Sequence, residues 1–109
     1  MKRYAYLVFT QPAPGQDAEY NRWYSEQHLG DVLRVPGFVS AQRFNLTQGD
    51  GPAPAPYLAV YEFESDDVNR TLSSLAERAG TPDMPLSPAL DLATVKTFVY
   101  EVIGDRKTR

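Results

Sequence analysis

Cysteine is absent from this chain of 109 residues, and histidine occurs once, as His28. Without cysteine the protein has no disulfide, no cysteine-bound iron–sulfur cluster and no thiol nucleophile. A single histidine outside any HxH or HExxH pattern argues against a transition-metal site. Glycine-rich loops of the GxGxxG or GxxxxGK type, which hold phosphate groups, are also missing. We therefore expect no bound metal and no cofactor.

Long apolar runs and clusters of basic residues are missing as well. No stretch approaches the ~18 apolar residues of a membrane helix, and the first residues show no signal-peptide pattern. The net charge is −3, and five of the 11 basic residues lie at the chain ends, so acidic residues outnumber basic ones in the rest of the chain. Nucleic-acid binding depends on clustered Lys and Arg. We expect a cytoplasmic protein with neither a nucleic-acid nor a membrane partner.

Two segments of the chain have a helical period. In residues 16–29 one face carries Tyr20, Trp23, Tyr24 and Gln27. Gly30 is expected to interrupt this helix. Ser65 is expected to cap a second helix over residues 68–79, which ends at Gly80.

Four other segments are rich in aromatic and β-branched residues, which is typical of strands. They are residues 4–10, 38–46, 57–63 and 94–103. The resulting order is βαββαβ, the split βαβ arrangement. It predicts one ferredoxin-like α+β domain over residues 1–109, with a four-stranded antiparallel sheet and both helices on one face.

Both faces of this predicted sheet carry apolar side chains. Tyr6 and Leu7 point to opposite sides of the first strand, as Val99 and Phe98 do in the last. Two helices cover only one face, and an antiparallel sheet face in contact with solvent is normally polar. An exposed apolar face usually marks an interface, so we predict a homodimer. The alternative is that long tyrosine side chains simply tolerate solvent.

His28 lies four residues after Tyr24, at the edge of the apolar stripe of the first helix. An imidazole there can exchange a proton near neutral pH, and Asp31 at i+3 can accept a hydrogen bond from one ring nitrogen. The side chains expected to bind a carbonyl or phenol are Tyr6, Tyr20, Tyr24, Tyr61 and Tyr100. Arg43 is a candidate for a substrate carboxylate, or lies at a sheet edge and reaches solvent. His28 is equally consistent with a structural role at the end of a helix.

The chain resembles the dimeric α+β barrel superfamily, particularly its EthD-like and stress-responsive barrel groups. The resemblance rests on the element order and on two segments, residues 23–28 (WYSEQH) and 35–38 (VPGF). It implies dimers whose sheets form a barrel, often with a cavity between sheet and helices. His28 corresponds to the histidine that such proteins carry at the end of the first helix. No second histidine and no cysteine accompany it here, which argues against two-histidine cavities and thiol mechanisms.

These observations favour a small cofactor-free enzyme that uses general acid–base catalysis on an apolar, aromatic or cyclic carbonyl compound. Its chemistry would be of the cyclase, isomerase, dehydratase or lyase type. His28 would move the proton, Asp31 would orient the imidazole, and tyrosines would position the substrate. The main alternative is a non-catalytic ligand-binding or stress-associated dimer. A third is an oxygenase of the same superfamily.

Overall fold

The computed structural model describes residues 1–109 and contains one four-stranded sheet in the order β2-β3-β1-β4. Every neighbouring pair of strands is antiparallel. The strands are β1 (Lys2–Thr10), β2 (Phe38–Asn45), β3 (Tyr57–Ser65) and β4 (Lys96–Glu101). The predicted ferredoxin-like α+β fold is confirmed. The last strand begins two residues later than expected, because a 3-10 turn, η2 (Leu92–Thr94), precedes it.

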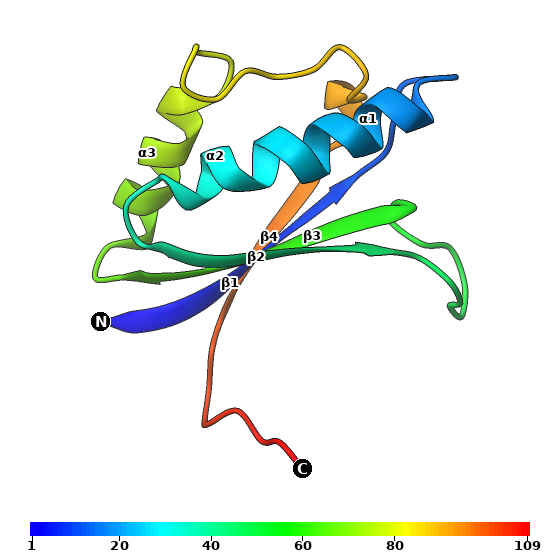
Figure 1. Cartoon of the computed structure of the whole chain (residues 1–109). Coiled ribbons are helices and arrows are strands. Elements are labelled where there is room, and N and C mark those ends of the chain that lie inside the picture. The colour runs from blue at the N-terminus through cyan, green and yellow to red at the C-terminus, as the bar shows by residue number, and fades with distance from the viewer.

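The helices lie on one face of the sheet (Figure 1). They are α1 (Asp17–Trp23), a π-helical segment η1 (Tyr24–His28), α2 (Leu29–Leu33) and α3 (Val68–Arg78). The expected interruption at Gly30 does not occur. A glycine inside a helix costs only about 1 kcal/mol relative to alanine, and packing of the flanking residues offsets it. The irregularity lies earlier, in the wide turn of η1.

Asp67, and not Ser65, caps α3. The Asp67 carboxylate accepts a hydrogen bond from the Arg70 backbone N–H at 3.1 Å. Ser65 lies one step earlier, where its hydroxyl accepts from the Asp67 N–H at 2.9 Å and pairs with the Thr71 hydroxyl at 2.7 Å. The predicted cap was therefore displaced by two residues, because Asp is as good a capping residue as Ser.

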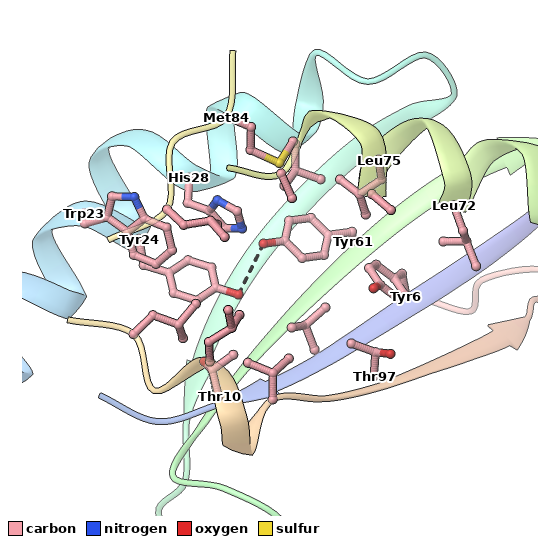
Figure 2. A pocket seen from close by; sticks show the side chains of 18 residues that line it. Tyr6, Thr10, Trp23, Tyr24, His28, Tyr61, Leu72, Leu75, Met84 and Thr97 are labelled. Carbon is pink, nitrogen blue, oxygen red and sulfur yellow. Dashed lines mark hydrogen bonds between the residues drawn. The ribbon is translucent and has the colours of Figure 1, made fainter. Parts of the chain in front are cut away.

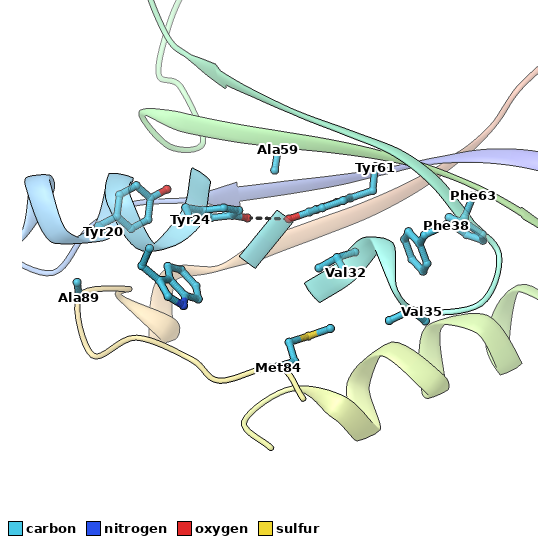
Figure 3. Close-up of a cluster of buried hydrophobic side chains, with 11 residues drawn as sticks. Tyr20, Tyr24, Val32, Val35, Phe38, Ala59, Tyr61, Phe63, Met84 and Ala89 are labelled. Carbon is cyan, nitrogen blue, oxygen red and sulfur yellow. Dashed lines mark hydrogen bonds between the residues drawn. The ribbon is translucent and has the colours of Figure 1, made fainter. Parts of the chain in front are cut away.

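The core lies between the sheet and the helices and is mainly aromatic (Figure 3). Its members with almost no exposed surface include Tyr20, Tyr24, Tyr61 and Phe63. Tyr61 of β3 lies opposite Tyr6 of β1 and Ala41 of β2, so the three share the face that meets the helices. Tyr6 and Tyr61 of this row line the site described below.

The centre of the opposite face of the sheet is apolar, as the sequence predicted, although Ser40, Glu62 and Lys96 lie on the same face. Phe44, Phe98 and Tyr100 lie on it with 44%, 48% and 59% of their surface exposed. Phe98 meets Phe9 edge-on, with ring centroids 6.0 Å apart. No helix covers this face (Figure 1). No helix of the protein has the length and apolar character needed to cross a bilayer.

Candidate active site

A cavity of about 200 Å³ lies between the sheet and the helices. Of its 18 lining residues, 15 are hydrophobic, and none carries a carboxylate, ammonium or guanidinium group. Its polar groups come from His28, from three tyrosines and from Thr10 and Thr97 (Figure 2). The cavity is therefore suited to an uncharged, mostly apolar ligand.

The chain between α3 and η2 forms part of the cavity wall through Met84, Leu86 and Leu90. This segment is tied to α1, because the Trp23 indole N–H donates to the Pro85 carbonyl at 3.2 Å. Trp23 is only 5% exposed, and it also lines the cavity. It thus joins the first helix to the wall of the site.

The wide turn of η1 brings three aromatic rings together. The Leu29 backbone N–H donates to the Tyr24 carbonyl, five residues back, instead of the four of an α-helix. Residues five apart then lie above one another, and the rings of Trp23 and His28 stack at 4.7 Å with planes 26° apart. The Tyr24 ring meets His28 edge-on at 5.1 Å. Single π turns of this kind are frequent at functional sites.

His28 is an uncharged imidazole at neutral pH. Burial lowers the pKa of His28 from 6.5 to about 4, and the nearby Asp31 charge opposes this shift only in part. Nδ1 is buried without a hydrogen-bond partner. The ring lies beside the hydroxyl groups of Tyr24 and Tyr61 (Figure 2). Nε2 is therefore the nitrogen available to a ligand in the cavity.

Asp31 does not form the expected hydrogen bond with His28. Its side chain is 3% exposed, and one carboxylate oxygen forms an ion pair with Arg34, three residues further along. The other oxygen, Oδ2, is buried and has no partner. Arg34 satisfies the carboxylate because it offers a full charge at the same i+3 spacing as His28, whose imidazole is neutral.

Two of the predicted tyrosines meet at the centre of the cavity. The Tyr61 hydroxyl donates to the Tyr24 hydroxyl at 3.4 Å (Figures 2 and 3). Burial raises the pKa of Tyr24 to about 12 and raises that of Tyr61 further. Burial also raises the pKa of Tyr6, which lines the same cavity. All three phenols are neutral at pH 7 and can serve as hydrogen-bonding groups, not as bases.

The remaining predicted residues lie outside the cavity. Tyr20 is fully buried and pairs with the Thr10 hydroxyl. Tyr100 lies opposite Ala5, on the far face of the sheet. Arg43 makes its contacts with α1 and η1. Sequence reasoning missed Thr10 and Thr97, although alternation along β1 puts Thr10 on the same face as Tyr6.

Solved structures resemble the chain over nearly its whole length, whereas no family model and no curated protein matches it. A structure of the heme-degrader MhuD from Mycobacterium tuberculosis with two hemes bound has a TM-score of 0.64 and 19% identity, covering 95% of this chain and 99% of that one. SnoaB, a cofactor-independent oxygenase from Streptomyces nogalater, has a TM-score of 0.59 and 16% identity, covering 99% and 97%. An EthD family protein from Bacillus halodurans has a TM-score of 0.53 and 10% identity, and the match covers 94% of this chain and 100% of that one.

The chain has the dimeric α+β barrel fold. At such identities the likeness concerns the fold alone, and it agrees with the predicted ferredoxin-like α+β architecture. Heme is one group that another protein with this barrel fold binds. The present cavity does not fit it: 200 Å³ lies below the ~300–1,000 Å³ of sites for drug-sized ligands, and no Lys or Arg lines it to pair with heme carboxylates.

Proposed function

We propose that this protein is a cofactor-independent oxygenase of small, uncharged, hydroxylated aromatic compounds, with His28 as the general base. One observation carries the proposal: the neutral imidazole is the only titratable nitrogen base in a cavity that is otherwise apolar or phenolic. Titratable groups whose pKa is strongly shifted by burial in a cavity are typical of functional sites.

The dimensions and charge of the cavity define the substrate class. A dry apolar cavity of about 150 Å³ holds a single benzene ring. The 200 Å³ here is accordingly suited to one or two fused rings. A carboxylate or phosphate on the substrate would have no cationic side chain to meet it and would lose its hydration. A compound such as 1-naphthol, with one hydroxyl group on two fused rings, has the required size and neutrality.

The reaction can be written for this substrate with balanced atoms. Nε2 of His28 accepts the naphthol hydroxyl proton, and the electron-rich naphtholate transfers electrons to dioxygen, which bonds to the carbon para to the oxygen. The proton of that carbon passes to the outer peroxide oxygen as the O–O bond breaks, which gives 1,4-naphthoquinone and hydroxide. The imidazolium then protonates the hydroxide to water. The sum is naphthol plus dioxygen to naphthoquinone plus water. The substrate itself supplies four electrons, so no cofactor is required.

Asp31 contributes by stabilising the protonated imidazole. Its negative charge raises the pKa of His28, against the effect of burial. With Nε2 as the base, Nδ1 already carries the proton of the neutral ring, so Asp31 acts through its charge. Its unpartnered Oδ2 and Nδ1 of His28 lie one helical turn apart. The Tyr24 hydroxyl, which accepts from the Tyr61 hydroxyl, serves the other charge by donating its own proton to the substrate oxyanion.

Oxygen chemistry is favoured over cyclase, isomerase, dehydratase or lyase chemistry for two reasons. The lining of the cavity is almost entirely apolar, which disfavours the water that would protonate the substrate anion and suits apolar dioxygen. A cofactor-independent oxygenase is also among the proteins that share the fold. The other reactions begin with the same proton transfer to His28, but they consume no oxygen, which gives a direct way to tell them apart.

We also propose that the protein is a homodimer in which a second copy covers the open sheet face. Phe44, Phe98 and Tyr100 are the large exposed side chains on that face. Such a patch is unusual on a monomer. The cavity lies on the opposite side of the sheet, so the dimer would leave the helices and the entrance to the site free.

The test uses protein without an affinity tag, treated with a chelator and supplied with 1-naphthol and air. We expect equimolar oxygen uptake and naphthoquinone formation, measured with an oxygen electrode and by absorbance. His28→Gln should lower turnover by about 10²–10⁴-fold, the usual contribution of a general base. Gln27→Ala, at the exposed neighbouring position, should leave it unchanged. Product formed without oxygen uptake would favour a lyase or isomerase, and saturable binding without turnover would favour a ligand-binding protein.

A further inference from the structure

Arg43 packs against the tyrosine that lies beside His28. Its guanidinium carbon lies 4.7 Å from the centroid of the Tyr24 ring and 5.4 Å from those of Tyr20 and Tyr57. A cation over an aromatic face is attracted to the π electrons. Arg43 is not one of the residues that line the cavity, so it acts on a bound ligand only through other residues.

The hydrogen bonds of Arg43 bracket the junction between α1 and η1. Nη2 donates to the Asn21 side-chain oxygen and Nη1 to the Ser25 hydroxyl, each at 2.8 Å. Asn21 lies before the junction and Ser25 after it. The Asn21 amide is fixed in turn, because it donates to the Tyr57 hydroxyl at 3.3 Å. The planar guanidinium is suited to this two-pronged contact, which a lysine ammonium cannot reproduce.

A π turn needs such support. Its hydrogen bonds span five residues instead of four, and it persists mostly as a single turn where surrounding contacts hold it. If η1 relaxed to an α-helical turn, the residues after the junction would rotate by about 100° relative to those before it. His28 would then no longer stack on Trp23 at 4.7 Å.

We propose that Arg43 is a positioning residue that holds the π turn by joining Asn21 to Ser25, and thereby keeps Tyr24 and His28 directed into the cavity. Arg43 lies opposite Ala59 of β3, two residues from Tyr61. The same pair of strands therefore positions both the Tyr61 hydroxyl and Arg43, whose contacts hold Tyr24 in place. The catalytic part of this inference rests on the proposed function, whereas the structural part does not.

The structural part is tested by NMR titration, because a single histidine gives a single imidazole signal. In the native protein we expect no protonation above about pH 5. Arg43→Met should misplace the π turn, admit water to the imidazole and raise its proton affinity at least tenfold. Asp31, the charged group that acts on His28, is kept in every variant. Arg43→Lys keeps the positive charge but cannot make both hydrogen bonds, so it should raise the proton affinity of His28 by a smaller amount.

Arg70→Met is the matched control, because it removes an exposed guanidinium from α3, away from the α1–η1 junction. The Arg70 side chain forms no ion pair, so its loss should leave the imidazole titration unchanged. An unchanged titration in Arg43→Met would refute the proposal whether or not the protein oxidises naphthol. If Arg43→Met does not fold, the same comparison is made with Arg43→Lys, and an unchanged titration there refutes it.

The catalytic part is tested with naphthol. Arg43→Met should lower kcat about 10–100-fold, as expected for a misplaced catalytic group, with KM changed less than about threefold. In a His28→Gln background the same substitution should lower the residual rate much less, because only the part of its effect that acts through Tyr24 remains. If the losses of turnover from Arg43→Met and His28→Gln were additive, Arg43 would have a general structural role, and its assignment as a positioning residue for His28 would be wrong. Shifted titrations in a protein without turnover would refute the proposed function and leave the role of Arg43 in place.

Discussion

Burial of an uncharged His28 couples the stability of the protein to pH. The pKa of His28 is about 4 in the folded chain, below the ordinary value of 6.5. As pH falls below 6.5, the unfolded chain therefore binds a proton that the folded chain refuses. Stability from this group is intact above about pH 7 and is lost as pH falls from 6.5 towards 4. One pKa unit corresponds to about 1.4 kcal/mol, so the full loss is roughly 3 kcal/mol.

Between pH 7.5 and pH 5.5 the part of this loss due to His28 is about 1.4 kcal/mol. Both values lie above the isoelectric point of about 5.0, where the protein is least soluble. Urea unfolding of the native protein and of His28→Gln, at equal protomer concentration, isolates the contribution, since all carboxylates are shared. With a slope of about 1–3 kcal/mol per molar urea, the native midpoint should fall by roughly 0.5–1.4 M more than that of the variant.

Equal losses of stability in the two proteins would refute this reasoning. They would mean that the folded protein accepts the proton without penalty, and so that the imidazole is hydrated or paired with Asp31 in solution. The same result would remove the argument that His28 is available as a neutral base throughout the physiological range.

Two further predictions concern the assembly and the helix cap. Sedimentation at micromolar concentration should give about twice 12.2 kDa, and Phe98→Glu, which places a charge on the open sheet face, should give a monomer. A native monomer at these concentrations would contradict the proposed dimer. Asp67→Ala should lower the free energy of unfolding by about 1 kcal/mol through loss of the α3 cap, measured by urea unfolding, whereas an exposed neighbour such as Asp66→Ala should have little effect.

The order of the elements could be predicted from the sequence because each one has a clear period. Alternating aromatic and β-branched residues identified all four strands, and the stripe that contains Tyr20 and Tyr24 identified the first helix. The position of the irregularity in that helix could not be predicted in this way. Gly30 carries a local signal for a break, but the π turn at residues 24–28 depends on tertiary contacts such as those of Arg43, which leave no pattern in neighbouring residues.

The site was predicted where one element determines it and missed where several elements meet. His28 and Tyr24 share one helical face, and Tyr61 follows from the alternation of β3. Tyr100 was grouped with them by residue type, although strand pairing opposite Ala5 puts it on the other face. Asp31 has two possible partners at the same spacing, His28 and Arg34. Only the three-dimensional arrangement shows that the arginine pairs with it.

The π turn of η1 has a consequence for how this site can be gained or lost. A π turn is equivalent to an α-helix that has received one extra residue without shifting its two ends. Deleting Glu26 or Gln27 would restore regular α-helical hydrogen bonding and leave Trp23 and His28 four residues apart, a spacing at which α-helical side chains also meet. The stacked pair is therefore compatible with two helix lengths that differ by one residue, provided that the turn changes with the length. A relative that lacks this residue would keep the pair only with a regular α-helical turn.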